Sequence, residues 1–158
     1  MNYDTLKIEY RILIEKDNTK ERYVTPFLWI NDELISEGLT VNIWQIVESL
    51  KGSGQYEILT CRCGETGCIG IWEGIIVLHE SDTIRWLIPE PIIRGDEPDE
   101  DEKKGIQKFR DKYFLKADYQ KAVASAVEEA KNLILEDVEN TRMMPYRSSV
   151  EAFLKLVV

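Results

Sequence analysis

Apolar residues recur at every second position near the start of the chain, and this alternation constrains the fold more than any other feature. The residues concerned are Leu6, Ile8, Tyr10, Ile12 and Ile14. Successive side chains of a strand point to opposite faces, so this spacing places all of these apolar side chains on one face. The segment therefore predicts a strand with that face on a core.

A second apolar segment, Tyr23 to Ile30, follows the polar stretch Lys16 to Glu21. The polar stretch contains Asp17 and Asn18, whose side chains tolerate left-handed turn conformations. We expect the two apolar segments to form an antiparallel hairpin, extended by Glu33 to Ile35.

The middle of the chain predicts one short helix and three more strands. Apolar residues at helical spacing favour a helix within Val41 to Leu50, which Gly52 and Gly54 end. The strands expected after it are Tyr56 to Arg62, Gly70 to Glu80 and Thr83 to Ile88. Ser81-Asp82 is a tight turn between the last two.

The C-terminal part predicts a strand and two helices. Phe109 to Leu115 is the strand, and Asp118 is placed to cap a long helix. Pro145 interrupts the chain, and Ser148 with Glu151 resembles a capping box for a last short helix. The apolar stripe expected on the long helix is Tyr119, Val123, Ala126, Val127, Ala130, Leu133, Ile134 and Val138.

Together these segments predict an α+β fold. We expect an antiparallel sheet of five to six strands, with one long helix in the C-terminal half and two shorter helices. The chain has 158 residues, of which 44% are apolar, and this suits a single domain over residues 1–158. The carboxylates of Asp96 to Glu102 repel one another, so residues 95–105 are expected to form an exposed acidic loop.

The charge balance favours a protein partner over nucleic acid or a membrane. Acidic residues outnumber basic ones by 29 to 20, and the formal net charge is -9. This charge repels phosphate backbones and anionic lipid surfaces, whereas it attracts a basic protein. Met1 to Tyr10 lack the apolar core of a signal peptide, and no apolar run approaches the roughly 20 residues that span a bilayer, so we expect a cytoplasmic location.

The most distinctive chemical feature is a group of three cysteines, Cys61, Cys63 and Cys68. Cys61 and Cys63 are two positions apart on an expected strand and so should face the same way. Gly64 and Gly67 can adopt positive φ angles, so a tight turn could return Cys68 toward the other two sulfur atoms. The three thiolates could then occupy three corners of the tetrahedral arrangement that zinc prefers.

Three interpretations of these cysteines remain open. They could bind a structural zinc ion, remain as reduced and partly buried thiols, or carry out redox or nucleophilic chemistry. A redox role would need a thiolate stabilised by nearby positive charge, and Arg62 is the basic residue inside the segment.

The single histidine, His79, is disfavoured as a fourth zinc ligand. It lies 11 positions after Cys68, which on a straight strand is a separation of roughly 35 Å unless Gly74 breaks that strand. In the hairpin around Ser81-Asp82, His79 pairs with Ile84, so we expect a half-buried histidine near a strand end. Glu65, Glu73, a water molecule or a residue from elsewhere in the fold are better candidates for the fourth ligand.

The segment Thr60 to Gly70 resembles two known groups of sequences. Its cysteine spacing is similar to the post-SET segment of SET-domain lysine methyltransferases, where three such cysteines and a fourth from the catalytic domain bind zinc. This chain has no counterpart of the SET catalytic motifs and no fourth cysteine, so the resemblance implies a local geometry alone. The segment also resembles small uncharacterised bacterial proteins with the pattern T-C-x-C-G-x2-G-C-x-G followed by an Arg-Trp pair, here Arg85-Trp86, and that resemblance implies no activity.

The motifs of common enzyme classes are missing from the sequence. It has no P-loop, no dinucleotide-binding fingerprint and no nucleophile elbow. The sequence thus favours a non-enzymatic protein-binding module, such as an immunity or antitoxin-like partner of a basic protein. The alternatives are an enzyme with a cysteine or carboxylate site and a zinc-stabilised regulatory domain.

Overall fold

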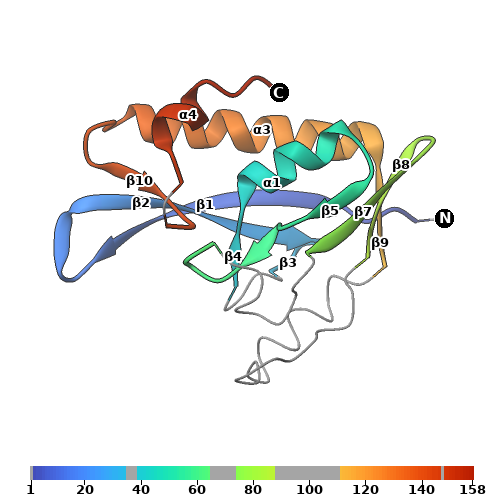
Figure 1. Ribbon diagram of the computed structural model, residues 1–158, viewed down its shortest axis with the longest axis horizontal. Helices are drawn as coiled ribbons and strands as arrows, with labels where there is room; N and C mark the ends of the chain where they lie inside the picture. The colour runs from blue at the N-terminus through green and yellow to red at the C-terminus, as the bar shows by residue number, and fades with distance from the viewer. Residues whose placement is uncertain (1, 35–38, 65–73, 88–110, 147) are drawn as a thin grey trace.

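In a computed structural model the chain folds into ten strands and three α-helices, counted over residues 2–34, 39–64, 74–87, 111–146 and 148–158, which the structure describes. The α+β class, the antiparallel pairing and the long helix in the C-terminal half are confirmed. The described strands divide among three sheets instead of joining in one (Figure 1).

The first sheet is built on the hairpin that the alternating pattern predicts. Its strands β1 (Leu6–Glu15) and β2 (Asn18–Ile30) are antiparallel, with Leu6 opposite Ile30. A tight turn at Asn31 and Asp32, both with positive φ, leads into β3 (Glu33–Leu34), which pairs with the end of β2. The expected hairpin is confirmed, and its second strand begins at Asn18, earlier than the apolar pattern indicates.

A strand that the sequence did not predict completes this sheet. β10 (Thr141–Met143) lies parallel to β2, on the side of β2 away from β1. β10 pairs with residues 22–24 of β2 and β3 pairs with residues 29–30, so Pro26 lies in the gap between them. Proline has no N–H to donate, and this position requires none.

The other two sheets contain the strands of the middle of the chain. β4 (Thr40–Val41) pairs with β6 (Leu59–Thr60). The third sheet has the order β5 (Gly54–Tyr56), β7 (Ile75–Glu80), β8 (Thr83–Leu87) and β9 (Lys112–Leu115).

The expected strand from Tyr56 to Arg62 is wrong, because this segment is split between two sheets. Tyr56 ends β5, and the chain then turns into β6. Ile58, Leu59 and Thr60 are all buried, whereas a continuous strand with one face on the core would bury every second residue. The N–H of Asn42 donates to the carbonyl of Ile58 (2.8 Å) at this bend.

The helices agree with the sequence in position but not in their caps. They are α1 (Ile43–Glu48), followed by the short 3-10 helix η1 (Ser49–Lys51), α3 (Lys116–Leu135) and α4 (Val150–Leu154). Asp118 is not the cap of α3, because the helix begins before it and Asp118 lies in the first turn. Ser149 caps α4 in place of Ser148, whose hydroxyl donates to the carbonyl of Pro145.

Helix α3 lies along the hairpin (Figure 1). It buries the stripe that the sequence predicts, except at its end. Leu133 is only half-buried, and Val138 lies beyond the helix and is exposed. Tyr10 donates a hydrogen bond to the carbonyl of Ala126 (2.8 Å), and Arg22 donates to that of Leu133 (2.6 Å). These bonds hold β1 and β2 against the helix.

Three aromatic rings connect the third sheet to α3 in the core. Trp86 of β8 packs edge-on against Phe114 of β9 and against Tyr119 of α3, with ring centroids 5.3 and 6.0 Å apart. The hydroxyl of Tyr119 lies 2.8 Å from that of Ser49, which begins η1. All three rings are almost completely buried.

Raising the pH above about 10 is expected to destabilise the fold through Tyr119 and Tyr10. Burial raises the pKa of both phenols, and the charge of Glu129 adds to the effect at Tyr10. Both phenols therefore stay protonated in the folded chain at a pH at which the unfolded chain ionises them. Their stabilisation is complete below the ordinary tyrosine pKa and falls above it by about 1.4 kcal/mol per pH unit for each phenol.

Urea unfolding between about pH 8 and about pH 11 measures this loss. The variant Tyr119→Phe should have a lower free energy of unfolding at neutral pH and a shallower alkaline decline. A free energy of unfolding that is constant over this range would contradict the prediction.

The acidic loop expected at 95–105 lies outside the described residues. Among the helices of the described ranges, none combines the length and the hydropathy that a membrane span requires.

Candidate functional sites: the cysteine turn and the edge of β1

The cysteine turn, residues 61–64, directly follows β6. Cys61 and Cys63 face each other, since a disulfide joins their sulfur atoms and their Cα atoms are 5.4 Å apart, but they lie in a turn and not on the strand that the sequence predicted. Gly64 adopts a positive φ (+91°), as expected for a glycine in a tight turn. Cys68 lies outside the described residues.

The cysteine turn is held in place by its own backbone and by the segment between β10 and α4. The N–H of Gly64 donates to the carbonyl of Cys61 (3.0 Å), and that of Tyr146 donates to the carbonyl of Arg62 (2.7 Å). A Cβ atom on Gly64 would lie 3.7 Å from Pro145. The turn therefore packs against residues that are distant in the sequence.

Beside the cysteine turn, the hydroxyl of Tyr146 interacts with two residues of opposite charge, Glu15 and Arg62. Its hydroxyl donates a hydrogen bond to Glu15, which raises the pKa of Tyr146, and burial adds to this effect. The positive charge of Arg62 lowers the same pKa. Arg62 thus interacts with a phenol as well as flanking the two sulfur atoms.

Zinc binding by Cys61, Cys63 and Cys68 stays a prediction. The described part of the chain contains two of these three ligands, and within it no group of three or more His, Cys, Asp or Glu residues is arranged to hold a metal ion. Glu65 and Glu73, the suggested fourth ligands, lie outside the described residues.

The position expected for His79 is confirmed. It is half-buried near the end of β7 and pairs with Ile84 across the hairpin. Its Nε2 atom lies 2.7 Å from the carbonyl oxygen of Ser49, and its backbone N–H donates to the hydroxyl of Ser53. These hydrogen bonds connect β7 to η1 and the loop that follows it, which is a structural role.

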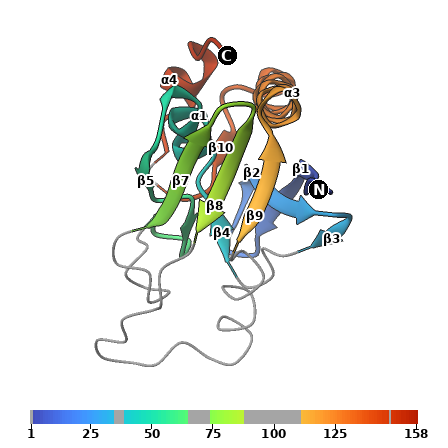
Figure 2. The same ribbon diagram turned by 90° about the vertical axis from the view of Figure 1, so that its right-hand side faces the viewer.

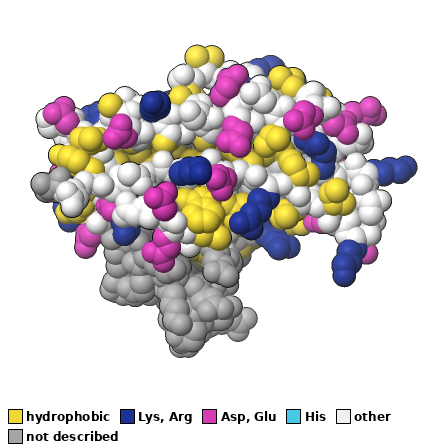
Figure 3. Space-filling model, turned by 180° about the vertical axis from the view of Figure 1, so that it is seen from behind, with side chains coloured by type: hydrophobic (Ala, Val, Ile, Leu, Met, Phe, Trp, Pro, Cys, Tyr) yellow, Lys and Arg dark blue, Asp and Glu magenta, His cyan; other side chains and the backbone are white. Residues whose placement is uncertain are grey.

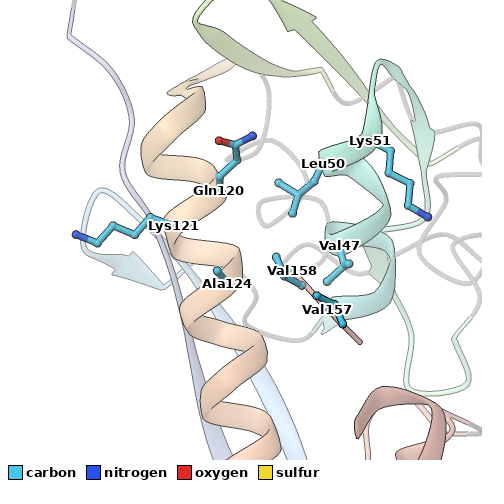
Figure 4. Close-up of a pocket in the computed structure, with 8 residues that line it drawn as sticks. All are labelled: Val47, Leu50, Lys51, Gln120, Lys121, Ala124, Val157 and Val158. Atoms are coloured by element: carbon cyan, nitrogen blue, oxygen red, sulfur yellow. The ribbon is translucent and has the colours of Figure 1, made fainter. Parts of the chain in front are cut away.

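A groove of about 500 Å³ between α1, α3 and the C-terminal residues lies apart from the cysteine turn (Figure 4). Val47 and Leu50 line it together with Val157 and Val158. Figure 4 shows Lys51 and Lys121 pointing away from the space between the helices. The groove is therefore mainly apolar and has no pair of acid and base groups directed into it.

The outer edge of β1 is a second candidate site, and the sequence did not reveal it. β1 is the last strand of its sheet, and no strand among the described ranges pairs with its outer side. Figure 2 places β1 on the side of the molecule away from β5 and β7. Figure 3 shows that side, where hydrophobic side chains gather near the middle with acidic and basic groups around them.

The hydrogen bonds of β2 determine which backbone groups of β1 face outward. The N–H of Arg22 donates to the carbonyl of Asn140, and the carbonyl of Val24 accepts from the N–H of Met144. Even-numbered residues of β2 therefore point away from β1, and its odd-numbered residues bond to odd-numbered residues of β1. It follows that even-numbered residues of β1 direct their N–H and C=O groups outward: Leu6, Ile8, Tyr10, Ile12 and Ile14.

The comparisons with known proteins give no further information about either site. No protein-family model matches the chain, and no curated protein and no solved structure matches it.

Proposed function

We propose that this chain is a protein-binding module that accepts an extended, basic segment of a partner as an extra strand along β1. The observation that carries the proposal is the outer edge of β1, a strand of 10 residues with which no strand of the described ranges pairs on that side. A long edge strand presents a row of unpaired backbone donors and acceptors, which can bind another chain by strand addition.

The side chains beside this edge suit an extended partner. Ile12 and Ile14 are 37% and 61% exposed on the face of β1 that also packs against α3. An added strand would place every second side chain next to them. A partner with apolar residues at alternate positions would cover this apolar surface.

The charges around the edge favour a basic segment. Glu129 of α3 is exposed, and its charge adds to burial in raising the pKa of Tyr10. At Lys7 the hydrogen bond and charge of Glu9 are the main causes of the raised pKa, and Glu129 adds a small contribution. Glu136, which directly follows the same helix, is 61% exposed, but it already forms an ion pair with Arg22 (3.2 Å). The net charge of -9 would also speed the encounter with a basic partner.

On the opposite face of β1 the basic side chains already have intramolecular contacts. Lys7 forms an ion pair with Glu9 (2.6 Å), and the guanidinium of Arg11 lies 4.2 Å from the ring centroid of Phe27. The ion pair offsets the charge of Lys7, whereas Arg11 keeps its positive charge above the ring of Phe27. An immunity or antitoxin-like role, in which the chain neutralises a basic protein, is one form of this function.

A displayed library of random peptides, selected on the purified chain, tests the proposal. We expect enrichment of extended sequences that alternate apolar residues with Lys or Arg. The variant Ile12→Pro should weaken their binding by roughly tenfold or more, because it removes an outward N–H but no bond to β2. Ile12→Val is the matched control and should bind as the parent chain does.

Circular dichroism of both variants is the control that tests whether they are folded. Binding that is equal in Ile12→Pro and the parent chain would overturn the use of β1, and failure to enrich any peptide would overturn the binding function. A dimer in sedimentation that Ile12→Pro dissociates would show that β1 pairs with a second copy, and this result would overturn the basic partner.

A further inference from the structure

The two described cysteines differ in their exposure. Cys63 is exposed, whereas Cys61 is half-buried and packs against the hydrophobic core. A thiol that approaches from solvent therefore reaches the sulfur of Cys63 more readily, and Cys61 becomes the leaving group.

A surface pocket of about 370 Å³ opens beside Cys63. Gly64, Pro145 and Tyr146 line it next to the cysteine turn, and Trp44 and Ser149 line it on the side of α1 and α4. The volume lies within the range of small-molecule sites, and the lining combines aromatic rings with hydroxyl and backbone groups. The pocket is shallow and open to solvent, and Cys63 is among the residues that line it.

A hydrogen bond links one wall of the pocket to the cysteine turn. The bond from the N–H of Tyr146 to the carbonyl of Arg62 (2.7 Å) connects the pocket wall to the residue between the two cysteines. A thiol in the pocket would therefore meet Cys63 in a defined geometry, which favours exchange at one sulfur over the other.

We propose that Cys61 and Cys63 form a reversible dithiol–disulfide pair that exchanges with a low-molecular-weight thiol bound in this pocket. The thiolate of the small molecule attacks the sulfur of Cys63, the bond between Cys63 and Cys61 breaks, and Cys61 leaves as a thiolate that takes a proton from water. A second thiolate then attacks the small-molecule sulfur and releases Cys63. Two thiols lose two electrons to form one disulfide, and the protein disulfide gains them.

This inference is independent of the proposed function, because it rests on the cysteine turn and not on β1. The test uses the purified full chain in buffers of reduced and oxidised glutathione, with alkylation of free thiols and measurement of intact mass. We expect the Cys61–Cys63 pair to interconvert reversibly. With Cys68 also replaced by serine, the variant Cys61→Ser should collect one glutathione on Cys63 roughly tenfold faster than Cys63→Ser collects it on Cys61.

The variant Cys68→Ser is the decisive control and should retain the Cys61–Cys63 exchange. If Cys68→Ser abolishes the exchange, or if the three thiols of the parent chain react only after a chelator removes zinc, the proposal is overturned in favour of a three-sulfur metal site. Equal rates of glutathione addition in Cys61→Ser and Cys63→Ser would contradict the claim that the pocket directs a small thiol to Cys63. The variant Tyr146→Ala should slow the addition at Cys63 if the pocket binds the small thiol, and an unchanged rate would also contradict the proposal.

Discussion

Replacing Trp86 with alanine is expected to lower the free energy of unfolding by about 3–5 kcal/mol. The side chain is completely buried in β8, next to the last residue of that strand. It contacts Phe114 and Tyr119 edge-on, and Phe114 and Tyr119 also contact each other with ring centroids 5.4 Å apart. The substitution therefore removes a large apolar side chain and two of the three ring contacts, and it leaves a cavity that the rigid sheet cannot close.

This loss is large compared with the total stability of about 5–15 kcal/mol that is typical of a domain. The variant should thus be partly unfolded well below the denaturant midpoint of the parent chain. Guanidinium unfolding followed by far-ultraviolet circular dichroism measures the effect without relying on tryptophan fluorescence.

Trp44→Ala is the matched control for this substitution. Trp44 also forms an edge-on ring pair, with Phe153 (centroids 5.4 Å apart), but it is only half-buried. Trp44→Ala should lower the free energy of unfolding clearly less than Trp86→Ala does, because the side chain of Trp44 buries less apolar surface when the chain folds. If the two variants were equally destabilised, the ring cluster around Trp86 would not be the centre of the core.

The elements that the sequence predicted well are those with a regular period over many residues. The alternation from Leu6 to Ile14 gave the strand and its buried face, and the stripe from Tyr119 to Ile134 gave the long helix. Such patterns record burial against one neighbouring surface, so they need no knowledge of what that surface is. Val138 was assigned to the stripe wrongly because the helix ends before it.

The features that the sequence missed depend on contacts between distant segments. β10 has three residues, too few to establish a period, and it is a strand because the side of β2 away from β1 is open to it. The split between Tyr56 and Leu59 has a similar cause, since these residues pair with different strands. Short strands of this kind are defined by their partners more than by their own residues.

At the two candidate sites, too, the sequence predicted local features but not contacts between distant segments. The sequence predicted that Cys61 and Cys63 face the same way because they lie two positions apart on a strand, but in the structure they do so in a turn, where a disulfide joins them. The packing of this turn against Pro145 and Tyr146 could not be predicted, because those residues lie in the C-terminal part of the chain. The exposed edge of β1 likewise depends on β10 pairing with the other side of β2.

Replacing Gly74 with alanine is expected to destabilise the fold by about 2–5 kcal/mol, from the sum of backbone strain and steric overlap. Gly74 precedes β7 directly and has a φ of +77°, in the left-handed region that residues with a Cβ atom rarely adopt. A Cβ atom there would lie 2.6 Å from the carbonyl oxygen and 2.9 Å from the carbonyl carbon of Tyr56. These are backbone atoms of β5, the strand that pairs with β7, so they cannot move aside without disturbing the sheet.

Gly52→Ala is the matched control for Gly74→Ala, because a Cβ atom on Gly52 would meet nothing within 4 Å and its φ of 162° is extended backbone. Its effect on the free energy of unfolding should stay within about 0.5 kcal/mol. Urea unfolding of both variants, followed by circular dichroism, compares them directly. A Gly74→Ala variant as stable as Gly52→Ala would mean that β5 and β7 do not approach each other closely at this point. The close approach of Gly74 to Tyr56 would then not explain why β7 begins at Ile75.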